Sequence, residues 1–260
     1  MISVQRLKLI QEMIEKNSFV SVKEIMERFE VSRSSAMRDL IELENQGIVI
    51  RERGGAMLKE KAATVSSANE AAIRTKENLH ASQKREICKM ASQTIQEGDC
   101  IYIDGGTTPL FLAEKIANMK VTIITPNTYF LEKLPVTFPG TIYLLGGEFG
   151  LGRDMSYGPL TIEMLKQFNF DLAFLSTNGI DLERKEVSVF DFQVGAVKKE
   201  VLKRCKHNRL LVDSSKIGKR AICSWAQLDS FQDIYMDTCP LEERPENVIV
   251  YEEKGKKENV

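Results

Sequence analysis

The sequence of 260 residues predicts an α/β protein in two parts, a small helical module and a larger domain built around a parallel sheet. Two observations predict this fold class. Residues 1–58 contain three short amphipathic helical patterns and then a glycine turn between two apolar segments. From residue 82 onward, short apolar segments alternate with helical patterns. That alternation is typical of a largely parallel, Rossmann-like sheet with helices on both faces.

Three helices are expected in the N-terminal module. The first covers residues 4–15. The second begins after Ser21, because Ser21 and Glu24 have the spacing of a capping box. The third follows Ser32, a residue type that caps helix N-termini, and should end near Gly47. Its buried face is expected to contain Ala36, Leu40, Ile41 and Leu43.

A hairpin follows the third helix, with strands expected at residues 48–50 and 56–58 around a glycine turn. Three helices and such a hairpin outline a winged helix-turn-helix, in which the third helix enters the DNA major groove. Arginine and serine side chains contact phosphates and base edges, and arginines of a wing enter the minor groove. The candidate DNA-binding residues are Ser21, Ser32, Arg33, Ser34, Ser35, Met37, Arg38, Arg51, Arg53, Gly54 and Gly55.

The charge of this module leaves an alternative open. Basic and acidic residues are equal in number over residues 1–60, and the whole chain carries a formal charge of -1. Charge alone therefore favours a helical bundle with a solvated polar face. The clustering of basic residues in the third helix and the hairpin favours DNA binding instead.

The chain is expected to divide into a DNA-binding domain at residues 1–58, a polar linker at 59–81 with some helix, and an effector-binding domain at 82–252. The expected strands of the last domain are residues 100–104, 121–125, 141–145, 171–176, 209–213, 233–236 and 248–251. Helical patterns cover residues 83–95, 109–117, 129–134, 161–168 and 192–206.

Polar turns follow several of these strands, and ligands of open parallel sheets bind at the carboxyl ends of the strands. Glycines expose backbone N–H groups, threonines donate hydrogen bonds, and Pro109 is expected to begin a helix whose N-terminus faces an anion. Threonines and Lys216 would hold a phosphate, and Asp104 and Asp181 would accept hydrogen bonds from sugar hydroxyls. The candidate effector-binding residues are Asp104, Gly105, Gly106, Thr107, Thr108, Asn127, Gly146, Gly147, Glu148, Asn178, Gly179, Asp181, Lys198 and Lys216.

The segments 31–40, 43–47 and 51–56 resemble the DeoR family of bacterial regulators, although Met37 stands where the family usually has arginine and Arg53 where it has histidine. Further matches lie at residues 104–108, 145–147, 171–174, 179–181, 197–198 and 213–216. The resemblance implies a repressor of a sugar-metabolism operon. It also implies a second domain similar to ribose-5-phosphate isomerase, which senses a phosphorylated sugar and then releases DNA.

Two other functions were weighed. A sugar-phosphate isomerase with an accessory domain needs a carboxylate base, for which Asp104, Glu148 and Asp181 are available. The attached helix-turn-helix argues against an enzyme, as does Val194, where the family often has glutamate. An activator without a ligand is disfavoured by the polar turns. Whether the effector releases or promotes DNA binding stays open.

The remaining expectations concern location and partners. The five cysteines form no Cys-x-x-Cys pair, and the two histidines have no ligand-like neighbours, so neither a metal site nor a catalytic triad is expected. No apolar segment is long enough to span a membrane, and no cleavable leader is visible, which favours the cytoplasm. The expected partners are double-stranded operator DNA, a phosphorylated sugar and further copies in a dimer or tetramer, without a cofactor.

Overall fold

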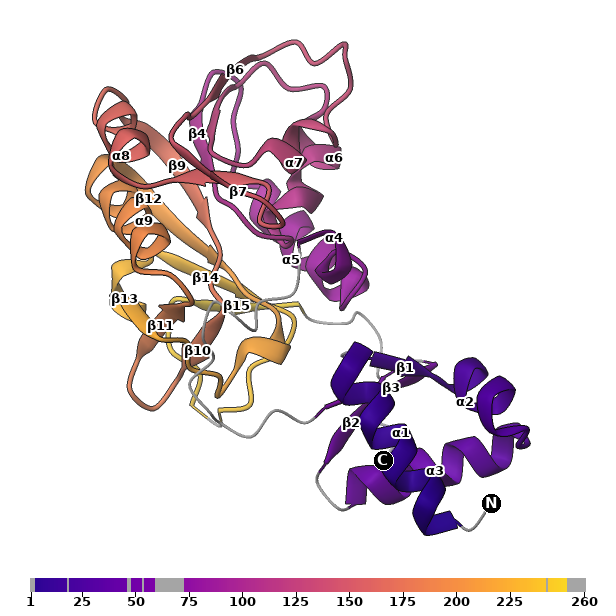
Figure 1. Cartoon of the computed structure of the whole chain (residues 1–260). Coiled ribbons are helices and arrows are strands. Elements are labelled where there is room, and N and C mark those ends of the chain that lie inside the picture. Colours follow the sequence, from indigo (N-terminus) through magenta and orange to yellow (C-terminus); the bar gives the residue numbers. More distant parts are fainter. Residues whose placement is uncertain are drawn as a thin grey trace, which may run out of the picture. The chain divides into compact units, whose positions relative to one another are not determined.

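A computed structural model describes residues 3–17, 19–45, 48–52, 54–58, 73–241 and 243–251. The chain divides into two compact units, Met1–Ala63 and Thr64–Val260 (Figure 1). Arg53 and most of the expected linker, at residues 59–72, lie outside the described residues. Among the described residues, no helix is both long and apolar enough to cross a membrane.

The first unit contains the three expected helices and the hairpin. The helices are α1 (Ser3–Asn17), α2 (Val22–Phe29) and α3 (Arg33–Asn45), and the strands are β1 (Phe19–Ser21), β2 (Val49–Glu52) and β3 (Gly55–Leu58). The strands pair antiparallel in the order β1-β3-β2. Strand β1 was not expected, because three residues are too few for a recognisable alternation. Fully buried side chains from all three helices, among them Ile10, Ile25 and Leu40, form one core with Val20 and Ala56.

The buried face of α3 differs from the prediction at one position. Ile41 is 39% exposed, whereas the neighbouring Asp39 is buried. Asp39 is buried because it accepts two hydrogen bonds from the guanidinium of Arg6 on α1, at 2.6 and 2.9 Å. This bidentate ion pair joins the first helix to the third and fixes the rotation of α3 about its axis.

The second unit is built on a seven-stranded sheet in the order β15-β14-β12-β9-β4-β5-β6, and every neighbouring pair in it is parallel. All seven strands expected from the sequence are present, so the prediction of a parallel α/β domain is confirmed. Their bounds are β4 (Cys100–Ile103), β5 (Thr122–Thr125), β6 (Thr141–Leu144), β9 (Phe170–Leu175), β12 (Cys205–Leu211), β14 (Asp233–Met236) and β15 (Val248–Val250).

Helices cover both faces of this sheet (Figure 1). One face packs against α5 (Ala81–Ser92), the 3₁₀ helix η2 (Pro109–Leu112), α6 (Ala113–Ile116) and α7 (Thr128–Leu131). The other packs against α8 (Pro159–Leu165) and α9 (Phe192–Arg204). Strand residues alternate between the two cores: Leu172 and Phe174 face the α5 side, and Ala173 and Leu175 face the α9 side.

Several elements differ from the sequence-based expectation. The helix expected at residues 192–206 ends at Arg204, because Cys205 already pairs with Phe170 as the first residue of β12. Pairing between distant strands here outweighs the local helical pattern. A two-stranded sheet and a three-stranded antiparallel sheet were not expected. They consist of β7 (Glu148–Gly150), β8 (Met155–Tyr157), β10 (Gly179–Asp181), β11 (Glu186–Val189) and β13 (Cys223–Gln227).

Candidate functional site

A cavity lies in the second unit, next to the segments that follow β4 and β9 at their carboxyl ends. Its empty volume is about 730 Å³, open solvent included. The lining residues are Lys76, Gly105, Gly106, Thr107, Thr108, Gly152, Arg153, Met155, Ser176, Thr177, Asn178, Phe190, Asp191, Val194, Lys198 and Lys216.

The cavity brings together half of the candidate effector-binding residues. Those that line it are Gly105, Gly106, Thr107, Thr108, Asn178, Lys198 and Lys216. Those that do not line it are Asp104, Asn127, Gly146, Gly147, Glu148, Gly179 and Asp181. Each residue of the second group has a role in the surrounding structure.

The loop after β4 contributes Thr107 and Thr108 to the cavity lining. The side chains of Thr107 and Thr108 have no hydrogen-bond partner among the described residues, so both can serve a ligand. Gly105 packs closely on Met155: a Cβ atom there would lie 2.3 Å from the methionine sulfur, so this side chain would have to move. Gly106 adopts a positive φ of 98°, which glycine tolerates. The helix expected after this loop is only the four-residue η2 followed by the four-residue α6.

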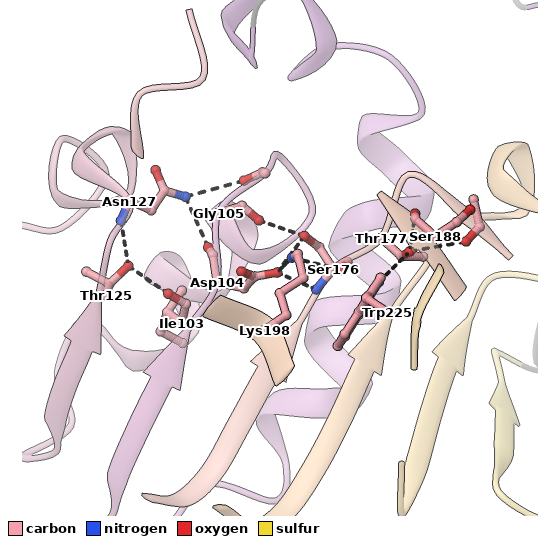
Figure 2. A network of polar contacts seen from close by, with 12 residues as sticks. Ile103, Asp104, Gly105, Thr125, Asn127, Ser176, Thr177, Ser188, Lys198 and Trp225 are labelled. Atoms are coloured by element: carbon pink, nitrogen blue, oxygen red, sulfur yellow. Dashed lines mark hydrogen bonds and ion pairs between the residues drawn. The ribbon is translucent and has the colours of Figure 1, made fainter. Parts of the chain in front are cut away.

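Asp104 is buried, and it contacts Ser176 and Lys198, which line the cavity (Figure 2). Its Oδ2 accepts hydrogen bonds from the backbone N–H and the hydroxyl of Ser176, both at 2.8 Å, and pairs with the ammonium group of Lys198. The Ser176 hydroxyl also lies 2.7 Å from the carbonyl oxygen of Gly105. Asp104 therefore positions Lys198 and the loop after β4, whereas the sequence-based interpretation made it a direct acceptor for sugar hydroxyls.

Asn127 also fixes the loop after β4. Its amide nitrogen donates to the carbonyl oxygens of Asp104 and Gly106, at 3.2 and 3.4 Å. Its side-chain oxygen caps α7 by accepting a hydrogen bond from the backbone of Phe130. With all of its polar atoms occupied, this buried asparagine is a positioning residue.

A group of basic residues lies on the α5 side of the cavity. The ammonium group of buried Lys84 donates to the carbonyl oxygen of Lys76 at 2.8 Å. Burial lowers the pKa of Lys84 to about 8; Lys216 and Lys76 add to this effect, and the carboxylate of Asp213 opposes it. Burial would raise the pKa of Asp213, but Lys216 and a hydrogen bond from Ser215 outweigh it, so the pKa lies below its ordinary value. Lys76, Lys84 and Lys216 therefore lie near one another, together with the carboxylates of Asp213 and Glu77.

The cavity lining also contains an ion pair that the sequence interpretation missed. Arg153 Nη1 lies 3.1 Å from Asp191 Oδ2, and both residues line the cavity. Asp191 caps α9 by accepting hydrogen bonds from the backbone of Gln193 and Val194. Partial burial tends to raise the pKa of Asp191, but Arg153 and the helix amides outweigh it and hold the pKa below its ordinary value.

Lys76, on the short helix α4 (Ile73–Lys76), is a second lining residue that was missed, since it falls in the segment read as linker. Helix α4 is held at the cavity by Arg74, whose guanidinium lies 3.1 Å from Asp154 and 2.7 Å from Glu132. No local signal in the sequence marks Lys76 as part of a site, because its position depends on these long-range ion pairs.

The glycine turns after β6 and before β10 serve packing. A Cβ atom on Gly147 would lie 2.2 Å from the hydroxyl oxygen of Thr161, and one on Gly179 would lie 2.2 Å from a carbonyl oxygen of Lys219. The carbonyl oxygen of Gly146 accepts a hydrogen bond from Thr161 at 2.7 Å. The last two candidates outside the cavity lining make other contacts: Glu148 accepts from Tyr157, and Asp181 accepts from the backbone of Arg184.

In the first unit, α3 presents part of the expected DNA-binding face. Arg33, Ser34 and Arg38 are exposed, and neither arginine has a partner among the described residues. Met37 is half-buried and packs against the core, so it contributes less to this face than expected. Ser32 caps the helix through the backbone N–H of Ser35, at 3.2 Å.

The hairpin exposes fewer of the candidate DNA-binding residues than the sequence suggested. The Arg51 side chain pairs with Glu44 at 2.6 Å. Gly54 is an exposed turn residue with a φ of 95°, whereas Gly55 is buried, and a Cβ atom there would lie 2.1 Å from the carbonyl oxygen of Val20. Ser21 caps α2 in the expected capping box with Glu24. Arg53 lies outside the described residues.

Comparison with known proteins identifies both units. Residues 6–62 match the DeoR-like helix-turn-helix domain, and residues 79–238 match the DeoR C terminal sensor domain. The chain belongs to the DeoR family. This DeoR-family protein thus has a helix-turn-helix domain for DNA and a sensor domain that contains the cavity. Residues 73–78, including Lys76, fall outside both matches.

Full-length relatives agree with this assignment. The DeoR-family chain is 30% identical to the glycerol-3-phosphate regulon repressor of Escherichia coli, over 91% of each chain. It is 32% identical to the lactose phosphotransferase system repressor of Streptococcus mutans, over 96% of this chain and 97% of the relative. Ribose 5-phosphate isomerase A of Methanocaldococcus jannaschii is a structural neighbour with a TM-score of 0.39 and 15% identity, covering 53% of this chain and 54% of that chain.

The family membership decides between the functions weighed from the sequence. The protein is a transcriptional repressor of the DeoR type and not a sugar-phosphate isomerase, since the family and its relatives are repressors. Within the described residues, no group of three or more histidine, cysteine, aspartate or glutamate side chains is arranged to hold a metal ion.

Proposed function

We propose that this repressor binds the operator of a sugar-metabolism operon in the cytoplasm and leaves it when a phosphorylated sugar occupies the sensor-domain cavity. The observation that carries the proposal is the loop after β4, where Thr107 and Thr108 line the cavity and their side chains have no hydrogen-bond partner among the described residues. Relatives named for the glycerol-3-phosphate regulon and for a lactose phosphotransferase system support the same ligand class.

The charges around the cavity suit a phosphate dianion. Its lining contains four cations, Lys76, Arg153, Lys198 and Lys216. Arg153 pairs with Asp191 and Lys198 with Asp104, and the charge of Lys216 lowers the pKa of Asp213. Lys76 and Lys216 add positive charge on the side where Lys84 is buried, and threonine hydroxyls and glycine N–H groups of the neighbouring loop complete an anion site.

The proposed binding of operator DNA depends on α3. Its exposed Arg33 and Arg38 flank Ser34, and such side chains reach phosphates and base edges when a helix lies in the major groove. The ion pair of Arg6 with Asp39 holds this helix against α1, so the exposed arginines project from a rigid support.

We also propose that the protein assembles through β6 of a second copy. Strand β6 is at the edge of the seven-stranded sheet, and its Ile142, Tyr143 and Leu144 are exposed. An edge strand with exposed apolar side chains favours pairing with another strand. Antiparallel pairing about a twofold axis would join two identical edges and supply two DNA-binding modules to a palindromic operator.

Binding of the purified full-length protein to a labelled promoter fragment tests the main proposal. We expect salt-sensitive binding that is reversed by at least one sugar phosphate from a panel, and the same compound should raise the melting temperature. Lys216→Met should abolish reversal while leaving DNA binding intact, and Lys199→Met, on the exposed face of α9, is the matched control. Binding of DNA that no phosphorylated sugar affects would contradict the proposal.

Light scattering of the full-length protein tests the assembly. Ile142→Glu in β6 should shift the mass towards the monomer, whereas Val136→Glu, an equally apolar but fully exposed loop position, should not. An unchanged mass for Ile142→Glu would show that β6 is not the interface.

A further inference from the structure

The cavity contains a second polar feature, on the side facing α9. Arg153 comes from the turn between β7 and β8, and Asp191 precedes α9; their side chains meet at 3.1 Å. Both side chains stay partly accessible, at 22% and 26%. The ion pair of Lys198 and Asp104 is withdrawn from solvent at 4% and 0%, so the Arg153–Asp191 pair is the more accessible of the two to a ligand.

The pair is held in place before any ligand arrives. One oxygen of Asp191 accepts hydrogen bonds from two backbone amides at the start of α9, and the other faces Arg153. The turn that carries Arg153 is fixed through its neighbour Asp154, whose carbonyl oxygen accepts from the backbone and the hydroxyl of Thr128, both at 2.9 Å. Asp154 also pairs with Arg74 of α4. A fixed donor and a fixed acceptor are therefore presented side by side.

The chemistry of the pair favours hydroxyl groups over a second phosphate. The carboxylate of Asp191 offsets the charge of Arg153, so an additional anion gains little there and is repelled by the carboxylate. A hydroxyl group both donates and accepts, and can bond to the carboxylate and the guanidinium together. Phe190 and Val194 line the cavity beside Asp191 and offer apolar surface for the carbon skeleton of a sugar.

The pair and the loop after β4 come from different segments of the chain but line the same cavity. Thr108 contacts α5, where the Cys88 thiol lies 3.1 Å from its carbonyl oxygen, and Lys84 belongs to the same helix. Asp191 precedes α9, which packs on the other face of the sheet, whereas the turn that carries Arg153 also contacts α7 through Thr128. A ligand whose phosphate lies against the loop after β4 would extend its other end towards this pair.

We propose that the Arg153–Asp191 pair binds hydroxyl groups at the end of the sugar away from its phosphate, and so selects monophosphorylated sugars over inorganic phosphate and over bisphosphates. This inference rests on the proposed function and deepens it. It assigns discrimination between effectors to two residues outside the loop after β4.

Calorimetric titration of the full-length protein tests the assignment, with inorganic phosphate, ribose 5-phosphate, fructose 6-phosphate and fructose 1,6-bisphosphate as probes. Asp191→Asn keeps an oxygen that can cap α9 and removes the charge, and Arg153→Gln removes the guanidinium. For the tightest sugar monophosphate we expect each change to weaken binding roughly 10-fold or more, the usual effect of losing a hydrogen bond to a charged group. Inorganic phosphate should bind the wild type and both variants with equal affinity.

Two controls complete the experiment. Asp181→Asn and Arg184→Gln alter a similar pair outside the cavity and should leave the affinity for every probe unchanged. Lys216→Met should weaken the binding of inorganic phosphate and of sugar phosphate alike. Melting curves without ligand verify that each variant is folded.

Several results would overturn the inference. Equal losses for inorganic phosphate and sugar phosphate in Arg153→Gln would make Arg153 part of the phosphate site. A bisphosphate that binds tightest, and loses that advantage in Arg153→Gln, would make the pair a second phosphate site. Unchanged affinity in both Asp191→Asn and Arg153→Gln would show that the Arg153–Asp191 pair does not contact the ligand. If no phosphate compound binds the wild type, the proposed function itself fails, a result distinct from the other three.

Discussion

The side chains of Lys198 and Asp104 form a buried ion pair, and neither group is more than 4% exposed. Lys198 comes from α9 and Asp104 from the end of β4, so the pair joins one helical layer to the central sheet. Asp104 also accepts two hydrogen bonds from Ser176, which belongs to the segment after β9 (Figure 2). One buried carboxylate thereby fixes three segments of the sensor domain.

Removing one member of this pair should destabilise the sensor domain. Asp104→Asn leaves the buried ammonium group of Lys198 without its countercharge, which typically costs about 3–5 kcal/mol. We expect a fall of that size in the free energy of unfolding of the sensor domain, measured by urea denaturation. The double variant Asp104→Asn with Lys198→Met should recover part of the loss. A double variant as unstable as the sum of the two single variants would show that the two charges do not interact.

The exposed arginines of α3 should carry operator affinity. Arg38→Ala removes a cation that has no partner among the described residues. We expect operator binding to weaken by about 1–3 kcal/mol, measured by fluorescence anisotropy at fixed salt. Lys8→Ala, an exposed lysine on α1, is the control and should bind nearly as the wild type does. Equal loss in both variants would mean that only the net charge of the module matters.

Effector binding should depend on pH through Lys84. With a pKa of about 8, Lys84 is mostly charged at pH 7 and mostly neutral at pH 9. A phosphate dianion nearby favours the charged form, so above pH 8 binding takes up a proton and the affinity falls as the pH rises, by at most about tenfold per pH unit. Phosphate esters are already dianions above pH 7, so their own titration does not contribute.

Titrations of the tightest sugar phosphate at pH 7, 8 and 9 measure this dependence. Lys84→Met should bind more weakly at pH 7 and should lose the decline between pH 7 and pH 9. A decline of equal size in wild type and variant would assign the titration to another group.

Helix α4 should couple the cavity to DNA release, since it follows the segment that connects the sensor domain to the DNA-binding module. Arg74 holds α4 through Asp154 and Glu132 but does not line the cavity. We expect Arg74→Gln to bind the effector about as well as the wild type and to release operator DNA less completely at saturating effector. Calorimetry measures effector binding, and fluorescence anisotropy measures the release of operator DNA. A parallel loss of effector binding would instead place Arg74 in ligand binding.

Much of the fold could be predicted from the sequence, because the signals are local. The capping box at Ser21 begins α2, and every strand of the parallel sheet appears as a short apolar segment. The loop at residues 105–108 could also be found, because glycines and threonines after a buried strand are typical of anion sites. The alternation of strands and helices then places that loop at the carboxyl edge of the sheet.

The rest of the site depends on contacts that no local pattern records. Gly147 and Gly179 belong to turns of the same composition as the loop after β4, yet packing against Thr161 and Lys219 accounts for them. Asp104 and Asp181 look alike in sequence, but one is buried against Lys198 and the other lies outside the cavity. Turn composition is the same whether a glycine approaches a ligand or a neighbouring segment.

The sequence by itself therefore determined the division into two domains, the seven strands of the parallel sheet and one loop that lines the cavity. The tertiary structure alone decided which side chains line the cavity. It brought Lys76 from the segment read as linker, and it joined Arg153 to Asp191 across 38 residues of sequence. The physical reason is that strand order and ion pairing set distances between remote segments, whereas periodicity and capping report only on neighbours along the chain.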